Sequence, residues 1–215
     1  MTGRIIKAIA GFYYVSVAGS GVYACRAKGI FRQMDLHPCV GDIADIEVTC
    51  EGDKEANVIK VHERKNLLFR PSAANVDQVL LVFALRSPKP NAGVLDRFLI
   101  QMEKTGVETV VCFNKTDLAD EEEAAKWTSV YESAGYRCLT CCAAREEGID
   151  AVKELLDGKL TVLAGPSGVG KSSLINLLSG EGRMETQEIS KKLKRGRHTT
   201  RHVELIAIDE DTFIC

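Results

Sequence analysis

A glycine-rich segment in the second half of the chain has the residue types and spacing that bind a nucleoside triphosphate. Residues 165–172 read GPSGVGKS and satisfy G-x-x-x-x-G-K-[ST]. The apolar run 160–164 precedes them and a helical pattern continues through Leu178, which is the strand–loop–helix context that the motif requires. Loop N–H groups and the helix dipole would bind phosphate oxygens. The predicted phosphate-binding residues are Gly165, Pro166, Ser167, Gly168, Val169, Gly170, Lys171, Ser172 and Ser173.

Two side chains of this loop have predicted chemical roles. Lys171 is expected to reach the β- and γ-phosphates, where it would stabilise charge in the transition state. The Ser172 hydroxyl is expected to ligate Mg²⁺.

A second segment predicts which base is bound. Asn114, Lys115, Thr116 and Asp117 follow the apolar run 109–113 and match the N-K-x-D pattern of GTP-binding proteins. A carboxylate at Asp117 accepts hydrogen bonds from N1–H and N2–H₂ of guanine, and adenine has no such donor pair. Asn114 would brace the loop, and the Lys115 stem would lie along the base. The tetrapeptide alone is also a common turn sequence, but with a phosphate loop in the same domain it predicts GTP and GDP as ligands.

The N-terminal part is predicted to be a small barrel. Apolar runs at 5–9, 12–17, 22–27, 42–48 and 56–61 alternate with glycine-containing turns, which is typical of five short strands. We expect an OB-fold-like β-barrel over residues 1–68. The charge of this region is nearly balanced, so a docking domain is as well supported as a strong RNA binder. Its aromatic residues are expected in the core more often than on a stacking surface: Tyr13, Tyr14, Tyr23 and Phe31.

The remainder, residues 69–215, is predicted to be one α/β domain. The segment RKNLLFRPSAANVDQ interrupts the strand rhythm and places the boundary. After it, strands alternate with amphipathic helices, which predicts a mainly parallel sheet with helices on both faces. Strands are expected at 79–85, 109–113, 136–142, 160–164 and 203–209, and helices at 92–105, 121–134, 149–156 and after Lys171.

The order of these motifs differs from that of Ras-like GTPases, in which the phosphate loop comes first. Here N-K-x-D comes first, Cys142-Ala143 takes the position whose backbone contacts the guanine oxygen, and the phosphate loop follows. A circular permutation retains the contacts and moves only the termini.

With this order the chain resembles the circularly permuted GTPases of the ribosome small subunit-dependent GTPase A family. The resemblance rests on the barrel, the joint RKNLLFRPSAANVDQ, NKTD, GPSGVGKSSLIN and RGRHTTRHVEL, and it covers essentially the whole chain. It implies a GTPase that acts late in maturation of the small ribosomal subunit and is stimulated by that subunit. It also makes residues 191–201, KKLKRGRHTTR, the first switch loop, with Thr199 or Thr200 meeting the γ-phosphate and Thr200 as a Mg²⁺ ligand. This basic cluster would equally suit rRNA phosphates, or be a solvated loop without a specific role.

One part of the family pattern is missing from this sequence. The family continues into Asp-Thr-Pro-Gly where the sequence stops, and Asp209-Glu210-Asp211-Thr212 is better interpreted as a hairpin turn. We therefore expect a truncated chain, or the ordered part of a longer one, that binds GDP, binds GTP more weakly and does not hydrolyse GTP efficiently alone. The zinc of the family's C-terminal domain has no ligands in this sequence.

Composition limits the other function classes. The formal net charge of −2 gives no general case for nucleic-acid binding, so an RNA-binding surface must be local. The eight cysteines suggest no disulfide framework, and a metal site at Cys138, Cys141 and Cys142 would need a fourth ligand. Without a signal peptide or membrane span, a cytoplasmic monomer is expected. Two other functions stay open: an ATP-dependent small-molecule kinase, and a non-catalytic RNA-binding assembly module stabilised by nucleotide.

Overall fold

The chain divides into two compact units. The computed structural model describes residues 1–27, 31, 37–69, 71–180 and 203–215. The first unit comprises residues 1–76 with 200–206 and 215, and the second comprises residues 77–199 with 207–214. Each unit is described by itself.

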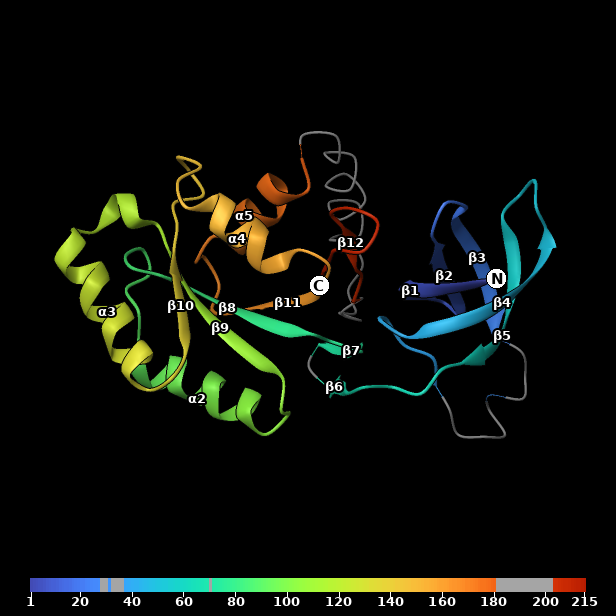
Figure 1. The fold of residues 1–215 in the computed structure, drawn as a ribbon, viewed down its shortest axis with the longest axis horizontal. Coiled ribbons are helices and arrows are strands. Elements are labelled where there is room, and N and C mark those ends of the chain that lie inside the picture. Colours follow the sequence, from blue (N-terminus) through green and yellow to red (C-terminus); the bar gives the residue numbers. More distant parts are fainter. Residues whose placement is uncertain (28–30, 32–36, 70, 181–202) are drawn as a thin grey trace. The chain divides into compact units, whose positions relative to one another are not determined.

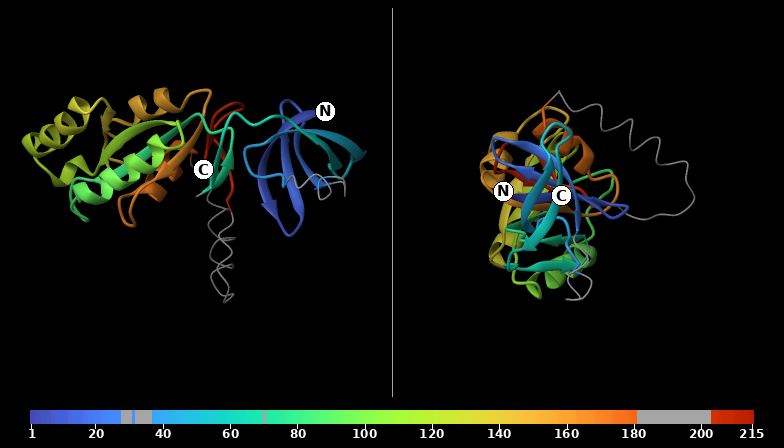
Figure 2. Two further views of the ribbon diagram at one scale, coloured as in Figure 1. Left: turned by 90° about the horizontal axis from the view of Figure 1, so that it is seen from below. Right: turned by 90° about the vertical axis from the view of Figure 1, so that its right-hand side faces the viewer.

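The first unit contains a closed five-stranded barrel with the strand order β1-β2-β3-β5-β4, which confirms the predicted OB-like fold (Figures 1 and 2). Strand β3 pairs parallel to β5, and the other neighbours are antiparallel. Tyr23 and Phe31 are buried in its core, as expected, whereas Tyr13 and Tyr14 are only partly buried. The strands are β1 (Thr2–Ile9), β2 (Phe12–Val17), β3 (Gly21–Ala27), β4 (Ile43–Cys50) and β5 (Glu55–Val61).

A buried ion pair joins the start of β4 to the chain that leaves β5. The Asp42 side chain has no exposed surface and accepts hydrogen bonds from Arg64 Nε at 2.7 Å and Arg64 Nη2 at 2.8 Å. The Cys39 N–H donates to the same carboxylate at 2.8 Å. Because every oxygen of this buried carboxylate is paired, the charge is compatible with the barrel interior.

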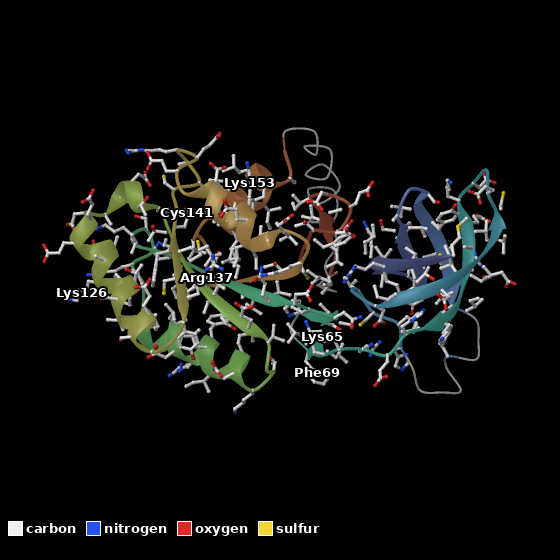
Figure 3. All side chains as sticks on the ribbon, viewed as in Figure 1. Lys65, Phe69, Lys126, Arg137, Cys141 and Lys153 are labelled. Carbon is white, nitrogen blue, oxygen red and sulfur yellow. The ribbon has the colours of Figure 1, made fainter. Side chains whose placement is uncertain are left out.

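The first unit also contains a hairpin that the sequence pattern did not predict. Strands β6 (Leu67–Phe69) and β7 (Ser72–Ala74) form a separate two-stranded sheet. The Asn66 side chain fixes its ends, because Nδ2 donates to Val76 O at 2.8 Å and Oδ1 accepts from Val76 N–H at 2.9 Å. Phe69 is 85% exposed on this hairpin (Figure 3).

The second unit is a six-stranded sheet in the order β10-β9-β8-β11-β13-β12 (Figure 1). Every pair from β10 to β13 is parallel, in agreement with the prediction. The strands are β8 (Gln78–Ala84), β9 (Glu108–Asn114), β10 (Arg137–Thr140), β11 (Leu160–Ala164), β12 (Ile206–Ala207) and β13 (Phe213–Ile214). The helices are α2 (Ala92–Glu103), the short 3₁₀ helix η1 (Thr116–Leu118), α3 (Glu121–Ser133), α4 (Ile149–Leu156) and α5 (Lys171–Leu178).

Alternate residues of the two central strands bury into opposite faces of the sheet. Leu81 and Phe83 of β8 pack with Leu95 of α2 and Tyr131 of α3. Their neighbours along the chain belong to a second cluster, with α4 and α5, that contains Leu80, Val82, Val152, Leu155, Leu174 and Leu178. Both faces are therefore covered by helices, and the strands are apolar throughout for this reason.

Two predicted strands are shorter in the structure than expected. The strand predicted at 203–209 is reduced to Ile206–Ala207, because the Leu205 N–H donates to Ile6 O and Glu204 forms a bridge with Lys7. The strand predicted at 136–142 ends at Thr140, because Cys142 turns to pair with Glu147. The hairpin turn predicted at 209–212 is confirmed, since Asp209 Oδ1 accepts from the N–H groups of Asp211 and Thr212.

Among the residues that the structure describes, none of the helices is long and apolar enough to cross a membrane.

Candidate guanine nucleotide site

The predicted site segments all follow the carboxyl ends of neighbouring parallel strands. Asn114 ends β9, Cys142 lies two residues beyond β10, and Gly165 follows β11 directly. Because β10, β9, β8 and β11 are adjacent and parallel, these loops emerge at one edge of the sheet. This edge is where ligands bind in open α/β sheets.

Asn114 joins the three segments. Its side chain is 1% exposed, and its Nδ2 donates to Val169 O in the phosphate loop at 2.9 Å. Its Oδ1 accepts from the Ala143 N–H at 3.1 Å. A buried amide with both ends paired fixes the distance between the segments, as the predicted bracing role requires.

Lys115, the residue after Asn114, also binds the phosphate loop. The residue has a left-handed backbone (φ 63°), and its Nζ donates to Gly168 O at 2.7 Å. The same Nζ donates to Ser87 O, in the loop that follows β8. Sequence reasoning missed Ser87, because the group that takes part is a backbone carbonyl and leaves no residue-type signal.

The Asp117 carboxylate is hydrogen-bonded through one of its two oxygens. Its Oδ1 accepts from Cys142 Sγ at 3.0 Å. Among the described residues no hydrogen bond reaches its Oδ2. Burial, together with the hydrogen bond to Asp117, raises the pKa of the Cys142 thiol, so the thiol stays protonated and remains a donor at neutral pH. Asp117 is therefore held in one orientation with an acceptor free for a base. Thr116 continues this turn, and its N–H donates to Cys141 O at 3.3 Å.

The phosphate loop adopts backbone conformations that favour glycine. Gly165 has φ +135°, and a Cβ there would lie 2.1 Å from Val82 O. Gly170 has φ +99°, and a Cβ there would lie 2.2 Å from Asn114 Nδ2. Val169, between them, is 1% exposed and packs in the core, which fixes the loop to the sheet.

Seven of the predicted residues line one cavity of about 360 Å³. Ser172 and Ser173 are exposed in the first turn of α5, next to the loop. The cavity is thus surrounded by loop backbone, two ammonium groups and hydroxyls, which are the donors that a phosphate chain with Mg²⁺ requires. The seven are Lys115, Ser167, Gly168, Gly170, Lys171, Ser172 and Ser173.

Lys171 is held by the first two residues of the loop, Gly165 and Pro166. Its Nζ donates to Gly165 O at 2.8 Å and to Pro166 O at 2.6 Å. Desolvation lowers the pKa of Lys171. An ammonium group that is partly removed from water and bound only by neutral carbonyls gains strongly from an anionic partner.

Other predicted elements lie outside the described residues or outside the pocket. Thr199, Thr200 and the basic segment 191–201 fall outside the described residues. In the described part of the chain, no group of three or more His, Cys, Asp or Glu side chains is placed to hold a metal ion. Cys141 instead contacts Cys112, with 3.5 Å between the sulfur atoms.

Replacement of Gly170 by Ala is expected to lower the affinity for GDP about tenfold or more, because the Cβ displaces the Asn114 amide that braces the loop. Titration with fluorescent GDP measures this change. Gly135→Ala is the matched control: Gly135 has φ +93°, but a Cβ there meets nothing within 4 Å. Both variants should lose similar stability from backbone strain, and equal GDP affinity in the two would contradict the role given to Asn114.

Comparisons with known proteins match this chain to one family over nearly its whole length. The RsgA GTPase family matches residues 61–215, and the RsgA N-terminal domain matches residues 2–57. A protein of Agathobacter rectalis named small ribosomal subunit biogenesis GTPase RsgA is 47% identical over 100% of this chain and 74% of its own. A protein of the same name from Alkaliphilus metalliredigens is 43% identical over 99% of this chain and 72% of its own.

Two solved structures have the same fold. YjeQ from Thermotoga maritima matches with a TM-score of 0.79 and 31% identity over 99% of this chain and 72% of that one. YloQ, described as a circularly permuted GTPase, matches with a TM-score of 0.77 and 32% identity over 99% of this chain and 69% of that one. The N-K-x-D segment of this chain precedes its phosphate loop, and the chain belongs to the RsgA GTPase family, a family of GTP hydrolases.

Proposed function

We propose that the pocket binds GTP and GDP and that Asp117 selects guanine. We call residues 114–117 the base-recognition turn. The observation that carries this proposal is the set of hydrogen bonds by which Asn114 and Lys115 join this turn to the phosphate loop. Asp117 Oδ1 is held by Cys142, which leaves Oδ2 for the base. The Ala143 N–H already donates to Asn114 Oδ1, so an N–H group that follows it in this turn would meet the guanine oxygen.

The phosphate chain would lie in the cavity between Lys115 and Ser173. Loop N–H groups of residues 165–170 would bind the β-phosphate, and Lys171 would leave its carbonyl partners for the β- and γ-phosphates. The Ser172 hydroxyl is the proposed Mg²⁺ ligand in the described part of the chain, joined by Thr200, whose role rests on the resemblance to the family. Bound Mg²⁺ would neutralise charge that develops on the phosphate oxygens during hydrolysis.

The proposed biological role is in the late maturation of the small ribosomal subunit, with GTP hydrolysis stimulated by that subunit. The support comes from relatives that are named for small ribosomal subunit biogenesis. We propose that the chain acts in the cytoplasm as a monomer and that the subunit's rRNA forms part of the contact. Kinase activity is not favoured, because the whole chain matches a GTPase family and an Asp117 carboxylate has no role in binding adenine.

The test compares GTP hydrolysis by the chain alone, with purified small ribosomal subunits and with large subunits. Small subunits are expected to raise the rate by about tenfold or more, and large subunits should leave it unchanged. Co-sedimentation with small subunits should be stronger with a non-hydrolysable GTP analogue than with GDP. Equal sedimentation in both nucleotides, without stimulated hydrolysis, would support the non-catalytic assembly module instead.

A further inference from the structure

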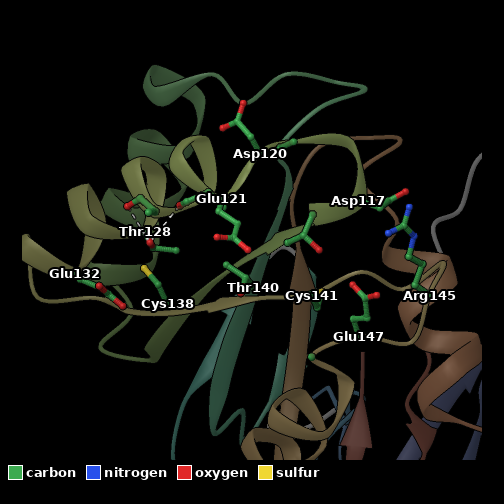
Figure 4. A pocket seen from close by; sticks show the side chains of 15 residues that line it. Asp117, Asp120, Glu121, Thr128, Glu132, Cys138, Thr140, Cys141, Arg145 and Glu147 are labelled. Carbon is green, nitrogen blue, oxygen red and sulfur yellow. Dashed lines mark hydrogen bonds between the residues drawn. The ribbon is translucent and has the colours of Figure 1, made fainter.

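A second cavity of about 670 Å³ lies between α3 and β10 (Figure 4). One wall is a stripe of α3 residues at helical spacing, from Glu121 through Thr128 to Glu132. Cys138 and Thr140 of β10 form the other wall. Asp117 of the base-recognition turn lines one end. We call this space the α3–β10 groove.

The groove runs along an unpaired edge of the sheet. β10 is the terminal strand of the six-stranded sheet in the described part of the chain. In a strand, successive residues direct their backbone groups to opposite sides. The Cys141 N–H donates to Phe113 O of β9, so Cys138 and Thr140 direct theirs away from β9.

Neighbouring residues limit this edge to a short register. The Tyr136 N–H already donates to Tyr131 O, and Gly148 lies so close that its Cβ would be 2.4 Å from Thr140 O. The groups that remain open are the Cys138 N–H, the Cys138 carbonyl and the Thr140 N–H. They are the donor, acceptor and donor that one added strand can pair with.

The charge of the groove is strongly negative. Five carboxylates line it, and Arg145 is the single cation among the lining residues. Glu121, Glu132 and Glu147 form no ion pair with any other residue that the structure describes. A ligand with positive side chains would complement this surface, whereas the phosphates of a nucleic acid would be repelled.

We propose that the α3–β10 groove binds an extended, lysine- and arginine-containing segment of another polypeptide, which adds to β10 as a strand. From Glu121 to Glu132 the stripe spans twelve residues of α3, a rise of about 16 Å, which matches about five residues of extended chain. Paired backbone groups would fix the register, and alternate basic side chains would reach the carboxylates. This partner surface lies apart from the phosphate cavity but shares Asp117 with the proposed base site, and the proposal does not require that the pocket binds nucleotide.

The test uses a fluorescein-labelled peptide of alternating lysine or arginine and valine, seven residues long, titrated with the 215-residue chain and followed by anisotropy. Two further peptides carry N-methyl groups on one or the other alternate set of backbone amides, so their charge is unchanged. One N-methylated peptide is expected to bind about tenfold more weakly than the parent and the other about equally, because only one edge of the peptide faces β10.

Charge reversal on α3 provides the second arm of the test. Glu132→Lys, in the groove, is expected to weaken parent-peptide binding about fivefold or more, and Glu122→Lys, an exposed α3 residue outside the groove, less than about twofold. Both variants should bind GDP as the wild type does. The proposal is wrong if both N-methylated peptides bind like the parent, if the two variants weaken binding equally, or if spermidine at equal total charge displaces the peptide.

Discussion

Replacement of Asp117 by Asn should exchange the preference for guanine for a preference for xanthine. An amide at this position accepts from N1–H but opposes N2–H₂ of guanine with its own N–H, whereas it can donate to the 2-oxygen of xanthine. We expect GDP affinity to fall by about 10²–10³-fold, or about 3–4 kcal/mol, and xanthosine diphosphate to bind more tightly than GDP. Competition against a fluorescent nucleotide measures both constants.

The matched control for this change is Asp120→Asn. Asp120 lies three residues further on, is exposed and caps α3 by accepting from the Glu123 N–H at 2.8 Å. Asn caps helices as well as Asp, so this variant removes the same charge without loss of the helix start. GDP affinity within about twofold of wild type is expected. If Asp120→Asn weakened GDP binding as much as Asp117→Asn, the effect would be one of general charge and the base-specific role would be wrong.

Replacement of Lys171 by Met should remove most of the affinity for the phosphate chain. The ammonium group is partly desolvated and is bound by the Gly165 and Pro166 carbonyls, so it is already positioned at the cavity. Loss of its charge-assisted bonds to phosphate is expected to weaken GDP and GTP binding about 100-fold, or about 2.7 kcal/mol. Isothermal titration in the presence of Mg²⁺ measures the loss.

Lys153→Met is the control for this second substitution, because Lys153 is an exposed lysine of α4 outside the phosphate cavity. Thermal unfolding followed by Trp127, the chain's only tryptophan, reports on the same domain. A Lys171→Met protein that unfolds at the wild-type temperature and binds GDP normally would show that Lys171 does not contact phosphate.

The candidate site residues that the sequence pattern names and the structure brings together are those in which residue type carries the chemistry. Glycines at 165 and 170 are required by positive φ and close backbone approach, so their spacing could be recognised without coordinates. Asn114 and Lys115 could be placed because they match the N-K-x-D pattern at the end of an apolar strand.

The features that could not be predicted from the sequence depend on backbone groups, on very short strands and on strand pairings between distant parts of the chain. Ser87 contributes a carbonyl, which every residue has, so nothing in its type marked it. The β6–β7 hairpin was missed because its strands have three residues each, too few for a periodic pattern. The strand expected at 203–209 was too long because the pairing of Glu204 and Leu205 with β1 is a tertiary contact.

The most direct measurement of the central claim is a competition titration of the wild-type chain with fluorescent GDP in Mg²⁺, challenged by GDP and ADP. The pocket built from Asn114, Asp117 and the phosphate loop predicts that GDP competes at least about 10³-fold more strongly than ADP, because adenine leaves the Asp117 carboxylate without donors. Equal competition by the two nucleotides would mean that the phosphate loop binds nucleotide without the base-recognition turn, and the account of the site would be wrong.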